Sequence, residues 1–314
     1  MIPEEVAKIL RKEKYAIVGR HSAVKKCRWL HESLVNNRYC YKQKFYGIKS
    51  HRCLQMTPAV IYCTHQCLYC WRVQKGDIGL NWEMPSEWDE PEIIVEESIK
   101  AQRQILSGYK VHKKVPYEKY LEAIEPKHAA ISLSGEPTLY PYLGGLIEEF
   151  HRREMSTFLV TNGTQPQRLA EITQPSQLYI SLSAPDIETY KAICRPLSPK
   201  LWNRIMESIE LMQSFTCPTV VRITAVKGLN MKKPEEYAKI IMKGNPTYVE
   251  VKAYMYVGLS RQRLKFENMP THEEVKRFAT KLAEELSYDI IDESKPSRVV
   301  LLSRLKKPIK IGKE

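Results

Sequence analysis

Eight cysteines are the residues whose type and spacing point most directly to chemistry in this 314-residue chain. Six of them lie within the 44 residues from Cys27 to Cys70, a density that favours metal or redox chemistry. The tightest group reads Cys63-Thr-His-Gln-Cys67-Leu-Tyr-Cys70. Three thiolates on a short loop suit a four-iron cluster in which one iron has no protein ligand. A structural zinc site needs a fourth ligand, which only His65 could supply within this group.

A second group of cysteines is spaced by twelve residues each time and consists of Cys27, Cys40 and Cys53. Its thiols could hold a second iron–sulfur cluster, or a zinc ion completed by a nearby histidine, for which the candidates are His21, His31 and His51. The spacing alone does not decide between these geometries. Cys194 and Cys217 stand apart and are expected to be buried structural thiols.

The net charge of +13 is concentrated at the two ends of the chain. Residues 1–52 hold 13 basic and 4 acidic residues, a balance of +9, residues 294–314 add +6, and residues 53–293 sum to −2. Basic segments at both ends suggest contact with a polyanion, although two solvated basic faces would look the same. No apolar run is long enough to span a bilayer, and residues 1–14 lack a signal-peptide core. We therefore expect a cytoplasmic protein with no membrane contact.

The middle of the chain alternates strand-like and helix-like segments. Strands are predicted at 59–63, 128–134, 156–161, 177–183, 219–225 and 248–256. Helices are predicted at 91–107, 141–154, 166–172, 201–215, 233–243 and 272–287. Six strand–helix units predict an α/β fold with a parallel sheet, curled into an incomplete (βα)6 TIM-like barrel. We expect this barrel at 57–290, with a basic extension at 1–56 and a basic tail at 291–314.

Polar residues interrupt several of these predicted strands. Strands buried on both faces should be almost wholly apolar, so polar stripes near their carboxyl ends predict an interior site. The stripes are Ser132, Ser134 and Glu136; Ser181 and Ser183; Arg222 and Thr224; and Glu250, Lys252, Tyr254 and Tyr256. The turn-like segments Ser134-Gly-Glu-Pro137 and Thr161-Asn-Gly163 add to this edge.

The Cys63, Cys67 and Cys70 spacing resembles the signature of the radical S-adenosylmethionine (SAM) enzymes, and Ser134-Gly-Glu-Pro137 resembles the glycine-glycine-glutamate-proline motif of that superfamily. The resemblance implies a [4Fe-4S] cluster on these three cysteines and SAM bound beside it. It also implies a set of SAM contacts: Tyr69 near the adenine, Ser134, Gly135 and Glu136 near the amino group, and Thr161, Asn162, Ser181 and Ser183 around the pocket.

The whole chain is similar to the 4-demethylwyosine synthases, radical SAM enzymes that modify tRNA. The similarity rests on the two cysteine groups, on the segment 40–48, and on Leu133-Ser-Gly-Glu-Pro-Thr138 and Ser181-Leu-Ser-Ala-Pro-Asp186. It implies the stand-alone archaeal type without a flavodoxin-like domain. Electrons would then come from an external donor, a ferredoxin or a flavodoxin, and we expect a monomer.

The family's reaction implies the remaining roles. The radical derived from SAM takes a hydrogen from the methyl group of N1-methylguanosine at position 37 of tRNA-Phe, the carbon radical adds to C2 of pyruvate, and C1 is lost. A lysine Schiff base would activate the pyruvate. Lys42 is the candidate, Lys252 is the reserve, and Lys42 could instead face a phosphate. Cys27, Cys40 and Cys53 would hold a second [4Fe-4S] cluster.

The basic amino-terminal region is expected to hold the anticodon region of tRNA, with aromatics that stack on splayed bases. The aromatics are Tyr39, Tyr41, Phe45, Tyr46 and Trp71, and core packing explains some of them equally well. Arg261 and Arg263 could add phosphate contacts or lie in a solvated loop. Two other functions compete: a radical SAM activase or peptide maturase, and a non-catalytic zinc and RNA-binding protein.

Overall fold

A ten-stranded mixed sheet organises the computed structural model, which describes residues 1–311 apart from the side chain of Ile78. Its strands are β1 (Tyr15–Val18), β2 (Ser22–Lys25), β3 (Cys53–Thr57), β4 (His128–Ile131), β5 (Ser156–Thr161), β6 (Gln177–Ser181), β7 (Thr219–Ala225), β8 (Tyr248–Ala253), β9 (Asp289–Ser294) and β10 (Val299–Ser303). They follow chain order across the sheet except that β10 lies between β8 and β9.

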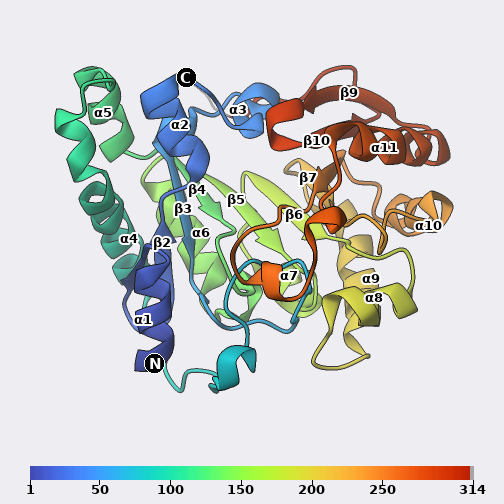
Figure 1. The fold of residues 1–314 in the computed structure, drawn as a ribbon, viewed down its shortest axis with the longest axis horizontal. Coiled ribbons are helices and arrows are strands. Elements are labelled where there is room, and N and C mark those ends of the chain that lie inside the picture. Colours follow the sequence, from blue (N-terminus) through green and yellow to red (C-terminus); the bar gives the residue numbers. More distant parts are fainter. Residues whose placement is uncertain (312–314) are drawn as a thin grey trace.

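The six central strands confirm the predicted parallel sheet. β3 to β8 pair in parallel with their sequence neighbours. Antiparallel strands extend both edges, with β1 and β2 beside β3, and β10 and β9 beside β8. The sheet is open, because β1 and β9 do not pair with each other, as an incomplete barrel requires (Figure 1).

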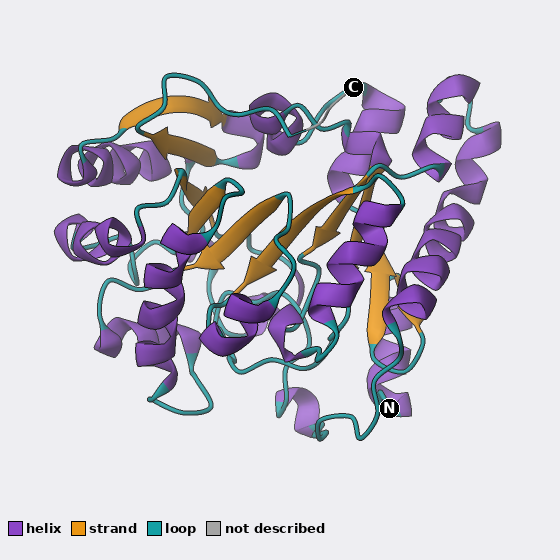
Figure 2. Ribbon diagram, turned by 180° about the vertical axis from the view of Figure 1, so that it is seen from behind, coloured by secondary structure: helices purple, strands orange, loops and turns teal. Residues whose placement is uncertain are grey.

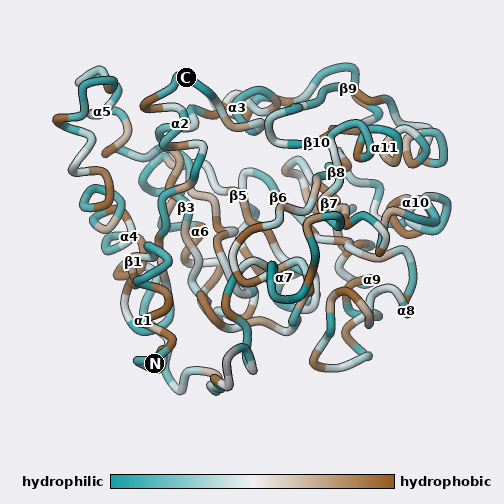
Figure 3. Tube along the Cα trace, viewed as in Figure 1, coloured by the Kyte–Doolittle hydropathy of each residue, from teal (hydrophilic) through white to brown (hydrophobic). Residues whose placement is uncertain are grey.

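Helices flank the sheet on its outer side, and loops gather at one end of the parallel strands (Figures 1 and 2). The α-helices are α1 (Glu4–Lys12), α2 (Arg28–Asn36), α3 (Tyr41–Tyr46), α4 (Pro91–Leu106), α5 (Tyr117–Ile124), α6 (Leu143–Arg152), α7 (Pro166–Glu171), α8 (Ile187–Cys194), α9 (Leu201–Leu211), α10 (Pro234–Gly244) and α11 (His272–Leu286). In Figure 3 the peripheral α11 is largely hydrophilic, since only one of its faces packs on the core. Among the described residues no helix has the length and apolar character needed to cross a bilayer.

Local signals at helix starts are confirmed. Pro91 and Pro234 occupy the first turns of α4 and α10, and Thr271 caps α11 in a reciprocal capping box with Glu274. The sequence pattern missed α1, α2, α3, α5 and α8 and the strands β1, β2, β9 and β10. These elements are short or lie at the edges of the sheet, where the hydrophobic period is weak.

The predicted strand at 59–63 is wrong, because the first parallel strand is β3 at Cys53–Thr57. Residues 59–62 are at most 6% exposed but form a turn, closed by the bond from the Tyr62 amide to the Ala59 carbonyl. They are apolar because they pack in a buried cluster that includes Val73, Trp82 and Leu133. A run of apolar residues in a buried turn looks the same in the sequence as a buried strand. β4, β6 and β8 also end earlier than predicted, at Ile131, Ser181 and Ala253. Ser132, Ser134 and Glu136 therefore lie in a loop.

One sheet runs through all three segments into which we divided the sequence. Residue 56 lies inside β3, and residue 290 lies inside β9. Part of the basic stretch 291–314 thus belongs to the sheet, since β9 extends to Ser294 and β10 pairs with β8 from Val299 to Leu302. Residues 312–314 of that stretch lie outside the described part of the chain.

Candidate active site and its two cysteine groups

A cavity of about 430 Å³ lies at the carboxyl ends of the parallel strands. It is lined on one side by residues of the cysteine loop, the name we give to residues 63–77, and on the other side by residues at the ends of β5 to β8. All three cysteines of the loop border it, as do Arg222 and Lys252. Of the eight predicted SAM contacts, seven line this cavity: Tyr69, Gly135, Glu136, Thr161, Asn162, Ser181 and Ser183. Ser134 borders a neighbouring cavity of about 180 Å³ on the other side of the loop.

The first half of the cysteine loop is braced by the end of α8. The Leu68 amide donates to the Ile193 carbonyl at 2.9 Å, and the Leu197 amide donates to the Thr64 carbonyl at 3.0 Å. His65 forms a β-bridge with Pro196, and its Nε2 lies 2.7 Å from the Tyr190 hydroxyl. A short loop without regular structure thus gains a strand-like partner that sets where its thiols point.

The sulfur atoms of the loop are spread more widely than one zinc ion requires. In residues 1–311, the one group of at least three potential ligand atoms all within 4.8 Å of one another is His65, Cys67 and Cys194. Zinc–sulfur bonds of about 2.3 Å place tetrahedral thiolates about 3.8 Å apart, whereas a four-iron cluster separates them further. Cys63, Cys67 and Cys70 do not form such a compact set among the described residues, so the structure does not favour a single zinc ion held by these three thiols. Cys194 is buried, as predicted, but also lies beside Cys67.

The Ser134-Gly-Glu-Pro137 segment is pressed against residues 59–62. Gly135 has φ +66°, and a Cβ there would lie 1.7 Å from the Ala59 carbonyl oxygen. The Ser134 hydroxyl donates to the Val60 carbonyl at 2.5 Å, and the Glu136 amide donates to the Tyr62 carbonyl at 2.7 Å. Only glycine allows this left-handed backbone and this close approach.

The Glu136 carboxylate is buried and accepts four hydrogen bonds. Its donors are the Thr138 amide at 3.0 Å and hydroxyl at 2.6 Å, the Thr161 hydroxyl at 2.6 Å and the Asn162 amide at 2.7 Å. Burial raises the pKa of Glu136, and these donors oppose that rise. The carboxylate thus fastens the end of β5 to the motif. Asn162 then reaches Thr64 in the cysteine loop, its Nδ2 donating to Oγ1 at 2.9 Å.

Tyr69, the aromatic residue before Cys70, is also held in place. Its hydroxyl donates to the Ser183 Oγ at 2.8 Å, which joins the loop to the segment after β6. Two of the predicted contacts, from segments far apart in the sequence, therefore meet directly. Sequence reasoning placed both at the site but did not foresee this bond.

The second cysteine group assembles at the start of three elements. Cys27 and Cys40 precede α2 and α3 as their N-caps, and Cys53 is the first residue of β3. Burial raises the pKa of Cys40 to about 11 and of Cys53 to about 12, and the Cys27 thiol adds to both increases. The ammonium groups of Lys42 and Lys252 lower the pKa of Cys27 and Cys40. Such mutual effects on pKa require that the three thiols and the two lysines lie near one another.

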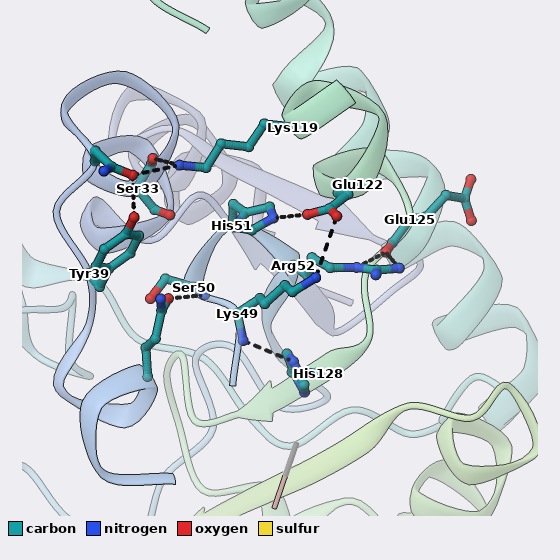
Figure 4. Close-up of polar contacts among 12 residues, drawn as sticks. Ser33, Tyr39, Lys49, Ser50, His51, Arg52, Lys119, Glu122, Glu125 and His128 are labelled. Carbon is teal, nitrogen blue, oxygen red and sulfur yellow. Dashed lines mark hydrogen bonds and ion pairs between the residues drawn. The ribbon is translucent and has the colours of Figure 1, made fainter. Parts of the chain in front are cut away.

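The histidines considered as zinc ligands face other groups. His21 Nδ1 lies 2.6 Å from the Pro58 carbonyl oxygen, and His31 Nδ1 lies 2.6 Å from the Tyr109 hydroxyl. His51 Nε2 lies 2.5 Å from a carboxylate oxygen of Glu122 on α5 (Figure 4). None of them joins Cys27, Cys40 and Cys53 in a compact set of ligands among the described residues.

Lys42 lies in the interior, so its alternative as a phosphate-facing surface charge is wrong. Its side chain comes from the first turn of α3, and the residue is 8% exposed. Its Nζ lies 4.1 Å from the ring centre of Phe158 and 4.4 Å from that of Tyr179. Burial and the Arg222 charge lower the pKa of Lys42 to about 8. In the described part of the chain, no carboxylate forms an ion pair with it.

A buried ion pair lies beside Lys42. Glu250 on β8 is fully buried and accepts from Arg222 on β7, with Nη2 at 2.7 Å and Nε at 3.1 Å. The hydroxyls of Tyr46 and Tyr179 donate to its other oxygen at 2.7 and 3.2 Å. The Arg222 charge lowers the pKa of Glu250. The polar stripes of β7 and β8 thus pair with each other in part through Arg222 and Glu250. Of these stripe residues, Arg222, Thr224, Lys252 and Tyr254 also line the cavity.

Three of the aromatics expected to stack on bases belong to the core instead. Tyr41, Phe45 and Tyr46 are at most 6% exposed. Their hydrophobic period on the short helix α3 was the missed signal, because all three face the sheet. Trp71 is partly buried, and Tyr39 is 41% exposed.

Both expectations for Arg263 are wrong, since it is buried against the cysteine loop. Its side chain is 9% exposed and forms an ion pair with Asp77. Arg261 is exposed, with its guanidinium 5.4 Å from the ring centre of Tyr256.

Comparisons with known proteins agree with this geometry. The Radical SAM superfamily matches residues 59–241, and the family described as wyosine base formation matches residues 243–304. The S-adenosyl-L-methionine-dependent tRNA 4-demethylwyosine synthase of Pyrococcus abyssi is 58% identical, over 96% of this chain and 90% of that protein. The protein of the same name from Pyrococcus horikoshii is 56% identical over the same shares. The chain therefore matches archaeal proteins over nearly their whole length, as expected.

The fold agrees as well. A structure of TYW1 with a lysine-pyruvate adduct bound superposes with a TM-score of 0.90 at 41% identity, over 99% of both chains. The cysteine loop, the cavity beside it and these matches lead to one conclusion: the chain belongs to the family of radical SAM tRNA 4-demethylwyosine synthases.

Proposed function

We propose that this protein forms 4-demethylwyosine in tRNA-Phe from N1-methylguanosine at position 37 and pyruvate. The observation that carries the proposal is one cavity bordered by the cysteine loop, the SAM-motif residues and Lys252. A peptide maturase or activase would not account for the family match, and a zinc and RNA-binding protein would not need the SAM motif.

The cysteines of the loop fit a [4Fe-4S] cluster, because three thiols border a cavity and are spread too widely for one zinc ion. When bound, such a cluster supplies the electron that cleaves SAM and so generates the radical. Gly135 lets the motif pack against residues 59–62, Glu136 fixes Thr161 and Asn162, and Tyr69 and Ser183 close the side of the pocket. A ferredoxin or flavodoxin would donate the electron, to a monomer of this chain.

We assign the formation of a Schiff base with pyruvate to Lys42. A relative's structure contains a lysine-pyruvate adduct. The Nζ of Lys42 would attack C2 of pyruvate and release water, forming a Schiff base. Its environment supports this role, because aromatic faces exclude water and no carboxylate in the described residues holds the ammonium in an ion pair. Lys252 lies in the same neighbourhood, on the cavity side.

Cys27, Cys40 and Cys53 are proposed to hold a second [4Fe-4S] cluster beside this lysine. The three thiols influence one another's pKa, yet do not form a set of atoms all within 4.8 Å. That combination suits a polynuclear cluster better than a single ion.

The tRNA is proposed to lie across the basic amino-terminal region and the helical hairpin of α4 and α5. Figure 4 shows how α5 is fastened to this region, through Lys119 to the Ser33 carbonyl and through Glu122 to His51. The exposed Tyr39 lies beside Lys119, whose Nζ is 5.6 Å from its ring centre. The connection between the two helices exposes three lysines, Lys110, Lys113 and Lys114. Cations interleaved with an exposed aromatic suit a single-stranded RNA loop.

Product analysis tests the proposed function directly. After anaerobic reconstitution with iron and sulfide, the protein is expected to convert tRNA carrying N1-methylguanosine to the tricyclic base in the presence of SAM, pyruvate and dithionite. Mass spectrometry of digested nucleosides should find the label from C2- and C3-labelled pyruvate and none from C1-labelled pyruvate. tRNA with unmodified guanosine at position 37 is the control. Product without added pyruvate would contradict the proposal.

The proposed tRNA surface predicts a change in salt dependence. The double substitution Lys113→Ala, Lys114→Ala should reduce the slope of log affinity against log salt by about 1.5, because each phosphate contact contributes about 0.7–0.9. Filter binding or fluorescence anisotropy of tRNA-Phe at several salt concentrations measures it. Lys232→Ala, Lys281→Ala is the matched control, since these exposed lysines lie near α10 and on α11, across the molecule from α5 (Figure 1). Equal slopes for both double variants would place the tRNA elsewhere.

A further inference from the structure

Arg263 contacts the cysteine loop from a distant part of the sequence. It lies between the short 3-10 helices Gly258–Gln262 and Phe266–Asn268, after β8. Its Nε donates to the Leu68 carbonyl at 3.5 Å, and its Nη2 donates to the carbonyls of Cys70 and, at 3.4 Å, Arg72. Its Nη1 donates to both carboxylate oxygens of Asp77, at 2.8 and 2.9 Å. One guanidinium therefore serves four groups of one loop.

The backbone around Arg263 meets the same loop. The Leu259 amide donates to the Trp71 carbonyl at 2.9 Å. Gly258 has φ +58°, and a Cβ there would lie 2.2 Å from the Trp71 carbonyl oxygen. The main chain of residues 258–263 thus contacts the main chain of residues 68–72. Only glycine at position 258 allows this contact, because any side chain there would collide with the Trp71 carbonyl.

Asp77 extends this connection inside the loop. Its carboxylate accepts from the Gln74 amide at 2.8 Å, and the Gln74 side chain donates to the Cys67 carbonyl at 2.8 Å. Two carbonyls of cysteines in the loop, those of Cys67 and Cys70, are therefore held by side chains within one connected set. The α8 segment braces residues 64–68, whereas Arg263 binds the carbonyls of Leu68, Cys70 and Arg72.

A loop without regular structure has no ladder of hydrogen bonds to fix its carbonyls. A planar guanidinium with five donors can bind several carbonyls and a carboxylate at once, which lysine, with one ammonium, does less well. Because Arg263 is 9% exposed, its charge is poorly screened by solvent and lies next to Cys70. The Asp77 carboxylate offsets part of this charge. The positive potential that remains beside Cys70, together with the hydrogen bonds to the loop carbonyls, favours the more negative, reduced form of a cluster on the loop.

We propose that Arg263 is a positioning residue that holds the Leu68–Arg72 part of the cysteine loop and raises the reduction potential of the cluster bound there. The second part of the proposal rests on the proposed cluster at Cys63, Cys67 and Cys70. The first part concerns the chain alone and holds for metal-free protein.

Two measurements on Arg263→Gln and Arg263→Lys test it. In metal-free protein, hydrogen–deuterium exchange of the amides in residues 64–77 should be about tenfold faster in Arg263→Gln, because local opening there costs less. In reconstituted protein, the midpoint reduction potential of the loop cluster should be more negative in Arg263→Gln than in the wild type. A redox titration measures it, monitored by the electron paramagnetic resonance signal that changes when SAM is added. Arg263→Lys should recover most of the potential, because it keeps the charge, and only part of the exchange protection.

Arg261→Ala is the matched control, since Arg261 is two residues away and exposed. Asp77→Asn should speed exchange in the same residues. Unchanged hydrogen–deuterium exchange in Arg263→Gln would overturn the positioning role. A reduction potential that falls in Arg263→Lys as far as in Arg263→Gln, although lysine keeps the charge, would overturn the electrostatic role. Wild-type protein that binds no iron would contradict the proposed cluster, while the exchange comparison would still decide the positioning role.

Discussion

Replacing Lys42 by alanine is expected to abolish the covalent capture of pyruvate. Incubation of the protein with labelled pyruvate and cyanoborohydride should reduce the Schiff base to a stable adduct, and peptide mapping should find it on Lys42. Lys42→Ala and Lys42→Arg should both lose the adduct, because neither offers a nucleophilic amine. Formation of the tricyclic base should fall by about 10³-fold or more, the scale seen when a covalent nucleophile is removed.

The chain offers two controls for this result. Lys44→Ala removes the next lysine of α3, which is exposed and bonded to Asp292 and the Glu293 carbonyl, and should leave capture unchanged. Lys252→Ala removes the partly buried lysine of the neighbourhood and should leave the adduct on Lys42, even if turnover falls. An adduct that persists in Lys42→Ala and disappears in Lys252→Ala would transfer the role to Lys252.

Iron analysis is expected to find about eight irons in the reconstituted wild-type protein, with similar sulfide and no zinc. The triple substitution of Cys27, Cys40 and Cys53 by alanine should leave about four, because only the cluster of the loop remains. The triple substitution of Cys63, Cys67 and Cys70 should also leave about four. Only the first of these two variants should still cleave SAM under reducing conditions.

Cys217→Ser is the control for thiol loss, since Cys217 lies apart from both groups in sequence and should retain about eight irons. About four irons in both wild type and the Cys27, Cys40 and Cys53 variant would contradict the second cluster. Zinc in place of iron in the wild type would contradict the radical mechanism altogether. Colour and electron paramagnetic resonance spectra, recorded with and without SAM, distinguish the two sites.

Local patterns in the sequence determined much of this protein. The cysteine loop, the Ser134-Gly-Glu-Pro137 turn, five of the six parallel strands and the starts of α4, α10 and α11 follow from short-range spacing and backbone chemistry. Such features depend on residues close in the chain, so they can be read without the fold. The family resemblance rests on the same short segments.

Long-range contacts were decided only by the tertiary structure. The placing of Lys42 in the interior depends on the packing of α3 against β5 and β6, since a lysine in a basic segment has no local signal of burial. The gathering of Cys27, Cys40 and Cys53 depends on how α2, α3 and β3, which start at these residues, pack together in the fold. Arg263 lies almost two hundred residues from the carbonyls that it binds. Hydrogen bonds and burial between such distant segments arise when the chain closes on itself, and no local period records them.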